Sequence, residues 1–375
     1  MPPADAIVIG AGPAGASAAF HLAHRGRDVV LLERESLGRS KPCGGGMAAS
    51  VQRWFPFDLS PVVDQVIRQV RFTWMLEDPV LANLPGEAPF WIVRRSNLDA
   101  FLAERAAEAG ATVRHATPVQ TVKREGDLWQ VVDNSGELWQ ARSLLIADGS
   151  SSPLASSLGL GPPRPRFAST LSVEVDCPLL EPGVAYFDFG SVPQGFCWAF
   201  PREHGYSIGV GTFIGQEDVD GEGVLQRLLP SLGLAQDAGV RRPFRLRVWD
   251  GHYPLDGPGV LAAGDAASLC DPFLAEGLRP ALMSGCQAAS ALDSWLDGDA
   301  QALKGYTAIM RRDWGDSMAW GKRIAQVFYR LPRVGYQLGV KRPTAPQRIA
   351  QILSGEMGYG DIAQRVIRRL LFQRG

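Results

Sequence analysis

The first thirty-three residues alternate between apolar runs and one glycine-rich turn. Residues 6–9 form a short apolar, β-branched run that is typical of a buried strand. This run leads into the turn at residues 10–15, and the small residues at 16–23 indicate a helix. A second apolar run at residues 29–32 ends at Glu33. The pattern therefore predicts a strand–turn–helix–strand unit that is followed by an acidic residue.

The following residues favour further helices and strands. A helix is expected over residues 48–64. Leu98, Leu102 and Ala106 recur at helical spacing, which predicts a helix over residues 98–109 that ends at Gly110. Apolar and alternating runs predict short strands at residues 66–74, 90–93, 112–115, 118–124, 129–132 and 144–146.

The pattern changes after residue 162, where alternating and aromatic runs predict a mostly antiparallel sheet with strands at residues 167–176, 184–189, 196–200, 206–213 and 243–249. Residues 259–263 return to the buried-strand pattern, and the chain is expected to be mainly helical from about residue 275. The predicted fold class is α/β, or α+β overall. We expect a discontinuous Rossmann-type domain (1–65, 94–161 and 255–300), an inserted antiparallel-sheet substrate domain (66–93 and 162–254) and a helical C-terminal section (301–375).

Composition narrows the function classes. The chain of 375 residues is long enough for two or three substructures, and its net charge of −1 gives no reason to expect a nucleic acid partner. Its five cysteines include no CxxC pair or Cys/His cluster, so we expect reduced thiols, a cytoplasmic setting and no metal. No signal peptide is expected, and no apolar run approaches the roughly 18 residues of a membrane span.

The glycine-rich turn carries the clearest chemistry. In a strand–turn–helix unit, Gly10 permits the tight turn, Gly12 lets a pyrophosphate approach the backbone, and Gly15 lets helix and strand pack closely. The N–H groups at the helix start then face the phosphates. Glu33, at the end of the second strand, stands where a carboxylate accepts hydrogen bonds from a ribose diol. The sequence therefore predicts dinucleotide binding.

Three further fragments join this fingerprint in a fixed order. Arg95 opens the predicted helix, Asp148-Gly149 ends one buried strand, and Gly264-Asp265 ends the last. Together they resemble the flavoprotein monooxygenase-like superfamily over about residues 5–290. An ionised carboxylate also suits the hydroxyls of a ribityl chain, although a helix N-cap is the alternative role for Asp148 and Asp265. The resemblance implies FAD contacts from Gly10, Gly12, Pro13, Ala14, Gly15, Glu33, Arg34, Cys43, Gly44, Arg95, Val119, Asp148, Gly149, Gly264, Asp265, Gly277 and Leu278.

Two other motifs are similar to those of the geranylgeranyl reductase family. Residues 41–46 resemble its KPCGG loop, and residues 195–201 resemble its YxWxFP strand, with Phe196 at the tyrosine position. Pro272 and Glu276-Gly277 match the PxxxEG run. The resemblance implies reduction of isoprenoid C=C bonds with FADH2, and a substrate pocket lined by Gly45, Phe196, Trp198, Phe200 and Pro201.

The role of Cys43 stays open at this point. A thiol beside three glycines and near a flavin is a candidate catalytic proton donor, whereas a small buried residue is the more ordinary role of a free cysteine. An external donor, expected to be NADPH, would reduce the flavin, although no second dinucleotide fingerprint marks its site.

Other flavoenzyme classes match less well. Disulfide reductases need a CxxxxC pair, and aromatic hydroxylases usually carry a histidine where Ser268 stands. Flavin halogenases share a similar aromatic strand but need a lysine between flavin and substrate, and no lysine lies between Lys41 and Lys123. An isoprenoid cyclase on the same fold remains an alternative, as does a monooxygenase, whereas a purely binding role is disfavoured.

The C-terminal section is basic. From Gln301 onward fourteen Lys/Arg stand against four Asp/Glu, a net of +10, so the first 300 residues carry −11. Apolar and basic residues interleave over 318–340 and 361–373. These helices are expected either to close the substrate pocket with a solvated basic face, or to form a peripheral membrane contact as well.

Overall fold

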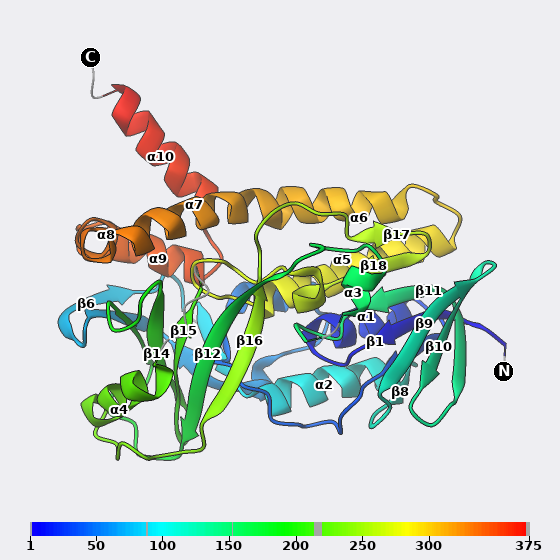
Figure 1. Ribbon diagram of the computed structural model, residues 1–375, viewed down its shortest axis with the longest axis horizontal. Helices are drawn as coiled ribbons and strands as arrows, with labels where there is room; N and C mark the ends of the chain where they lie inside the picture. Colours follow the sequence, from blue (N-terminus) through cyan, green and yellow to red (C-terminus); the bar gives the residue numbers. More distant parts are fainter. Residues whose placement is uncertain (1, 88, 152, 214–219, 373–375) are drawn as a thin grey trace.

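The computed structural model describes residues 2–87, 89–151, 153–213 and 220–372, with side chains as far as residue 365. Two large sheets stand side by side, and a long run of helices crosses above both (Figure 1). A small third sheet contains β3 (Gly46–Ala48), β7 (Phe90–Val93) and β4 (Val63–Ile67).

The eight-stranded sheet contains the predicted strand–turn–helix–strand unit. Its spatial order is β17 (Asp256–Gly257), β18 (Val260–Ala262), β11 (Leu138–Ile146), β1 (Ala4–Ile9), β2 (Val29–Leu32) and β8 (Thr112–Arg114), with β10 (Leu128–Asp133) beside β11 and β9 (Val119–Glu125) beside β10. The strands from β18 to β8 are parallel. Their carboxyl ends therefore meet at one edge of the sheet, where open α/β sheets bind ligands.

Helices cover this sheet because its central strands are apolar on both faces. They are α1 (Pro13–His24), α2 (Arg95–Glu108) and α5 (Leu278–Leu296), and the short α3 (Leu154–Ser157) follows β11. α1 packs closely against α5, since a Cβ atom added at Gly285 would lie 2.2 Å from the carbonyl oxygen of Ala14. The predicted helix over 98–109 is confirmed as α2, and Gly110 lies just beyond its end with φ of +110°.

The seven-stranded sheet confirms the predicted antiparallel region. Its order is β16 (Arg242–Val248), β12 (Arg166–Val175), β15 (Gly205–Thr212), β14 (Gly195–Arg202), β13 (Val184–Phe189), β5 (Gln69–Trp74) and β6 (Glu77–Asn83). All pairings are antiparallel except that between β13 and β5. One face carries α4 (Gly221–Ser231), which the sequence pattern did not predict, and Leu225 and Leu229 of α4 share a buried cluster with Cys197 and Ala199 of β14.

The predicted helix over residues 48–64 is wrong. The structure has a 3₁₀ helix at Ala49–Trp54, an extended residue at Phe55 and a second 3₁₀ turn at Ser60–Val62. Pro56 explains the break, because proline disfavours the helical region for the residue before it.

The predicted strand over 66–74 is also divided. Arg68 separates β4 from β5, which belong to different sheets.

The helical C-terminal section is confirmed. After α5 come α6 (Ala302–Met310), a π-helical turn at Arg311–Gly315, α7 (Asp316–Arg330), α8 (Pro332–Gly339), α9 (Ala345–Leu353) and α10 (Tyr359–Phe372). α6 and α7 run across the top of the molecule in Figure 1, while α10 points away from the body. Tyr336 of α8 donates its hydroxyl to the carbonyl of Asp78 at 2.8 Å, which ties α8 to the edge of the seven-stranded sheet.

None of the helices in the described part of the chain is long and apolar enough to cross a membrane. Within the same residues, no group of three or more His, Cys, Asp or Glu side chains is arranged to hold a metal ion.

Candidate active site

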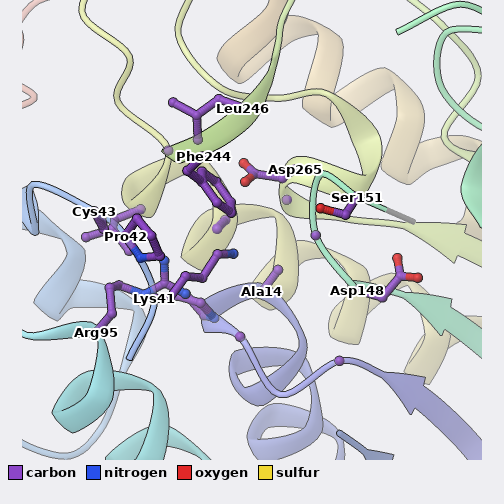
Figure 2. A pocket seen from close by; sticks show the side chains of 18 of the residues that line it. Ala14, Lys41, Pro42, Cys43, Arg95, Asp148, Ser151, Phe244, Leu246 and Asp265 are labelled. Carbon is purple, nitrogen blue, oxygen red and sulfur yellow. The ribbon is translucent and has the colours of Figure 1, made fainter. Parts of the chain in front are cut away.

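One cavity of about 580 Å³ joins the carboxyl edge of the parallel sheet to the aromatic face of the seven-stranded sheet. Its volume falls within the usual range for ligand pockets. All of the residues that the sequence assigns to FAD or substrate line it, except Gly15 and Pro201. Figure 2 shows Lys41, Cys43, Arg95, Asp148 and Asp265 gathered around the start of α1 at Ala14.

The glycine turn occupies one end of the cavity. Gly10 has φ of +100°, and a Cβ atom there would lie 2.5 Å from the carbonyl oxygen of Ala147, so neither backbone angle nor space admits a side chain. A Cβ atom at Gly12 would have as its only neighbour within 4 Å Arg95 Nη2, at 3.8 Å, so this position opens onto the cavity. Gly15 lies behind the turn, where a Cβ atom would lie 1.8 Å from the carbonyl oxygen of Gly10.

Glu33 connects the second strand to this turn. Its Oε2 accepts a hydrogen bond from the Ala11 N–H at 2.7 Å, and its Oε1 accepts one from the Glu35 N–H at 3.1 Å. The side chain is buried but lines the cavity. Each carboxylate oxygen can accept a second donor, so a ribose hydroxyl fits here without displacing the existing bonds.

Two arginines that line the cavity, Arg39 and Arg95, form hydrogen bonds to the buried acid Asp99. Arg95 donates two hydrogen bonds to the Asp99 carboxylate, from Nε at 2.8 Å and from Nη2 at 2.7 Å, and Arg39 donates a third from Nη1 at 2.9 Å. Burial opposes ionisation of Asp99, but the two guanidinium groups outweigh it, so the pKa of Asp99 lies below its usual value. Asp99 thus fixes the Arg95 side chain at the cavity wall.

The acids after the parallel strands face the cavity and do not cap helices. α3 begins several residues beyond Asp148, with no side-chain cap, and Asp265 lies inside a 3₁₀ turn at Gly264–Ala267 that also has no side-chain cap. The Asp265 carboxylate receives no hydrogen bond from the described residues and points into the cavity in Figure 2. The helix-cap alternative for these two acids is therefore wrong.

The N-terminus of α5 closes this side of the site. Gly277 is the residue before the helix, Leu278 is its first residue, and both line the cavity. A Cβ atom at Gly277 would lie 3.7 Å from Asp265 Oδ1. The N-terminus of α5, the positive end of its helix dipole, therefore borders the cavity beside Asp265.

The Cys43 loop lies between the two halves of the cavity. Gly45 has φ of +80°, and a Cβ atom there would lie 2.1 Å from the carbonyl oxygen of Val93, while one at Gly44 would lie 2.9 Å from the Phe200 ring. The backbone N–H of Gly45 donates to Cys43 Sγ at 3.3 Å. The Cys43 carbonyl accepts hydrogen bonds from Arg202 Nη2 and from Ser207 Oγ, each at 3.2 Å.

Lys41 is a site residue to which the sequence analysis gave no role of its own. Its ammonium group lies 5.3 Å from the centre of the Phe244 ring, and a Cβ atom at Gly149 would lie 3.6 Å from it. Burial lowers the pKa of Lys41, the positive charge of Arg95 lowers it further, and Asp265 partly offsets both effects. The side chain extends toward the start of α1 in Figure 2 and therefore lies in the dinucleotide half of the cavity.

Aromatic rings line the other half of the cavity. Phe196 stacks on Phe213 at 4.7 Å, and Phe187 contacts the edge of Phe200 at 5.2 Å between ring centres. Trp198 is buried, with its ring centre 6.4 Å from that of Phe196, and its Nε1 has no hydrogen-bond partner among the described residues. Such a wall accepts an apolar chain and excludes water.

Pro201 is a correction to the predicted substrate pocket. Side chains alternate between the faces of a strand, so Phe196, Trp198 and Phe200 face the cavity. Pro201 shares the opposite face with Cys197 and Ala199, which pack in the cluster with α4. The motif spans both faces of β14, and only its alternate positions can contact a ligand.

Other lining residues had weaker signals in the sequence. Phe244 and Leu246 project from β16 at the alternating positions of a predicted strand, so periodicity could have identified them. Leu353 had no such signal, because it reaches the cavity from α9 through tertiary packing alone. Together with the ring contact of 5.1 Å between Phe328 and Phe189, this places the C-terminal helices against the aromatic half of the cavity.

The donor set fits FAD. An open glycine turn at a helix N-terminus suits a pyrophosphate, and the Glu33 carboxylate suits a ribose. The Asp265 carboxylate lines the cavity and receives no hydrogen bond from the described residues. It can therefore accept hydrogen bonds from the hydroxyls of a ribityl chain. The individual contacts of the predicted residues with FAD stay predictions.

Comparisons with known proteins agree with this arrangement. The chain matches the family described as FAD dependent oxidoreductase over residues 5–71 and 87–292. It is 32% identical over 313 residues to digeranylgeranylglycerophospholipid reductase 2 of Methanothermobacter thermautotrophicus, which covers 77% of this chain and 79% of that relative.

Two solved structures resemble the whole fold. A geranylgeranyl bacteriochlorophyll reductase-like protein from Thermoplasma acidophilum superposes with a TM-score of 0.77 at 20% identity and covers 94% of this chain and 91% of its own. The flavin-dependent brominase Bmp2 has a TM-score of 0.71 at 19% identity and covers 98% and 99%. At such identities these likenesses concern the fold alone.

Proposed function

Because the chain belongs to the FAD-dependent oxidoreductases, and among them to the geranylgeranyl reductase family, we propose that it reduces carbon–carbon double bonds of an isoprenoid chain. The observation that carries the proposal is the single cavity in which the dinucleotide motif meets an aromatic wall. An isoprenoid chain is apolar and branched, so its burial against Phe196, Trp198 and Phe200 is favourable.

The chain's residues divide the work as follows. Gly10, Gly12 and Glu33 would hold the dinucleotide, with Arg95, Asp148, Asp265 and Gly277 along its length. When bound and reduced by the external donor, the flavin would supply the hydride for one alkene carbon and return to its oxidised form. The aromatic wall holds the chain in line and excludes water, which is the protein's contribution through positioning.

Cys43 is the residue that we propose as proton donor to the other alkene carbon. Its Sγ lies in the loop between the two halves of the cavity, and the Gly45 N–H at 3.3 Å is placed to stabilise the thiolate that remains after the proton leaves. Arg202 and Ser207 fix the backbone of Cys43 and thereby the position of the thiol.

The electron donor that we propose is a nicotinamide, NADPH being the expected one. No second glycine fingerprint in the sequence marks a site for it, which favours transient approach of the donor to the flavin end of the cavity.

Halogenation gains no support from the cavity. A halogenase needs a lysine between flavin and substrate, and Lys41, the lysine among the lining residues, has its ammonium group beside Gly149 and Asp265 in the dinucleotide half. The likeness to a brominase at 19% identity concerns the fold and not this chemistry.

We also propose a peripheral contact with a lipid bilayer. The name of the phospholipid reductase relative specifies a lipid substrate, and prenyl chains of such lipids lie within membranes. On this chain, four apolar side chains are exposed on α7, on α8 and at the residue between them: Val327, Leu331, Val334 and Leu338. We call these four residues, with Arg330 and Arg333, the α7–α8 surface. Residues 317–355 contain seven Lys/Arg and no Asp or Glu, so the surface suits anionic lipid.

The mass of the product tests the proposed function. FAD-loaded enzyme is reduced with dithionite without oxygen, mixed with geranylgeranyl diphosphate or a digeranylgeranyl glycerophospholipid, and the products are weighed by mass spectrometry. Reduction adds two hydrogen atoms for each double bond, while the flavin absorbance returns to the oxidised form. A cyclase would change retention without changing mass. Unchanged substrate with both head groups would overturn the proposal.

A further inference from the structure

Besides Cys43, a second group that can carry a proton lines the cavity near the start of α5. Glu276 lies in the turn before α5, and its side chain is 7% exposed. Arg279 donates from Nη2 to Glu276 Oε2 at 2.6 Å. Glu276 Oε1 is buried and has no hydrogen-bond partner among the described residues. One carboxylate oxygen is therefore held, and the other is left to carry a proton or to meet a ligand.

The groups around Glu276 come from three elements. Arg279 belongs to α5, Cys270 and Asp271 to the turn before it, and Tyr359 to α10. Asp271 differs from Glu276 in that both of its oxygens are satisfied. Oδ1 accepts from the N–H groups of Phe273 and Leu274, and Oδ2 accepts from the Tyr359 hydroxyl at 2.6 Å. Asp271 thus stabilises the turn, while Glu276 Oε1 has no hydrogen-bond donor in the part of the chain that the structure describes.

The environment favours the neutral acid. Burial raises the pKa of Glu276 to about 7, against the opposing charge of Arg279, and Asp271 adds to the rise. A carboxylic acid with this pKa is protonated below neutral pH and ionised above it. Such a group exchanges protons most effectively near its pKa.

We infer that Glu276 is the group that returns a proton to Cys43 after each alkene reduction. The inference rests on the proposed function, in which Cys43 gives its proton to carbon. The O–H bond at Glu276 Oε1 breaks and the S–H bond of Cys43 forms again, directly or through a water molecule. Cys43 and Glu276 line the same cavity, and Arg279 holds the other oxygen of Glu276. Arg279 stabilises the carboxylate that remains, and solvent water reprotonates it.

The role predicts different effects on the first and on later turnovers. Enzyme that starts with a protonated Cys43 needs Glu276 only after its first reaction. Glu276→Gln should therefore leave the single-turnover rate of the dithionite-reduced holoenzyme within about twofold, and slow multiple turnover by about tenfold or more at about pH 6. Wild-type multiple turnover should fall between about pH 6 and about pH 8, as Glu276 loses its proton, and the variant should lose this dependence.

A spectroscopic readout does not depend on the reaction. The infrared carbonyl band of a protonated carboxylic acid in the FAD-loaded enzyme should disappear as pH rises through about 7, and it should be absent in Glu276→Gln. Glu276→Asp retains an acid and should retain both the band and the pH dependence. Asp188→Asn is the matched control, because Asp188 is another buried acid whose pKa is raised by burial and it does not line the cavity.

Each outcome decides one point. If multiple turnover of Glu276→Gln keeps the wild-type rate and pH dependence, the inference is overturned. If the first turnover is slowed as much as later ones, Glu276 does not act by resupplying Cys43, and the inference also fails. If the enzyme reduces no isoprenoid, the proposed function fails. The infrared titration still reports in that case, and a missing band would overturn the assignment of a protonated Glu276.

Discussion

At the scale of single residues, space decides more than chemistry. Gly10, Gly44 and Gly45 are required because the chain approaches itself closely there, whereas Gly12 faces the cavity. Spacing in the sequence could identify all four, since the motifs have a fixed order. Spacing could not predict the role of Lys41, because this residue lies in an irregular loop and the position of its side chain depends on how the Cys43 loop folds. Nor could it show that Glu276 Oε1 is buried without a hydrogen-bond partner among the described residues.

Gly12→Val should abolish FAD binding. The branched side chain would occupy the space that the glycine leaves open for a pyrophosphate. The ratio of flavin to protein absorbance in purified protein measures the effect, with Gly305→Val as control because a Cβ atom at that helical glycine meets nothing within 4 Å. Full flavin occupancy in Gly12→Val would show that this turn does not hold the dinucleotide.

Cys43→Ser should slow alkene reduction by about a hundredfold while flavin reduction by the external donor changes little, because a hydroxyl is a far weaker acid than a thiol. Stopped-flow absorbance separates the two half-reactions. Cys177→Ser, at a half-buried cysteine that does not line the cavity, should affect neither. Equal slowing of both half-reactions in Cys43→Ser would indicate a disturbed loop instead of a lost acid.

At the scale of elements, regular patterns were predictable and local exceptions were not. The parallel strands β1, β2 and β18 and the end of β11 are runs of buried apolar residues. Alternating or aromatic runs indicated the strands β12 to β16, so most of both sheets follows from the sequence pattern, whereas β6 was not predicted. The wrongly predicted helix over 48–64 has the composition of a helix, but it contains Pro56, which interrupts the helical backbone. Beyond the break, the Phe57 carbonyl accepts a hydrogen bond from the Gln52 side chain at 2.7 Å and not from a helical N–H group.

The hairpin of β14 and β15 has a role beyond lining the cavity. It carries Arg202 and Ser207, which both hold the Cys43 carbonyl. Ser207→Ala should cost about 1 kcal/mol of unfolding free energy, the usual worth of one hydrogen bond, and slow the alkene half-reaction several-fold. Denaturant unfolding and stopped-flow measure the two effects. Thr170, which also lines the cavity but bonds the Phe244 carbonyl, supplies the control Thr170→Val. If both variants slow the reaction equally, the Cys43 carbonyl contact has no special importance.

At the scale of the whole molecule, the basic residues of the C-terminal section lie on helices that also expose apolar side chains, at the α7–α8 surface. The predicted closure of the cavity by C-terminal helices agrees with the position of Leu353, and the membrane contact stays a proposal. Its apolar component lies on α7 and α8. The Arg365 side chain on α10 is exposed, while those of Arg368 and Arg369 lie outside the described residues.

The enzyme should sediment with anionic vesicles at low salt and remain in the supernatant with neutral ones. Arg330→Gln with Arg333→Gln should weaken binding by about 2 kcal/mol, since each basic residue near an anionic surface contributes about 1 kcal/mol. Val240→Asp, at an exposed apolar residue far from these helices in the sequence, is the control. Replacement of Arg365, Arg368 and Arg369 by Gln tests α10 separately. If the wild-type enzyme stays in the supernatant with anionic vesicles at low salt, the proposed membrane contact is wrong, and these helices only close the cavity.

The order of strands in the parallel sheet also bears on how the protein is made. β1 and β2 are neighbours in the chain and can pair early, but β1 also pairs with β11 and β11 with β18, which the ribosome delivers much later. Contacts that are so distant in sequence close slowly. Asp148, Asp265 and α5 therefore join the glycine turn only when most of the polypeptide has emerged, and Leu353 arrives later still. FAD would accordingly meet a complete site only after synthesis, so that cofactor uptake is a late step of folding and a nascent chain stalled before residue 260 should emerge without flavin.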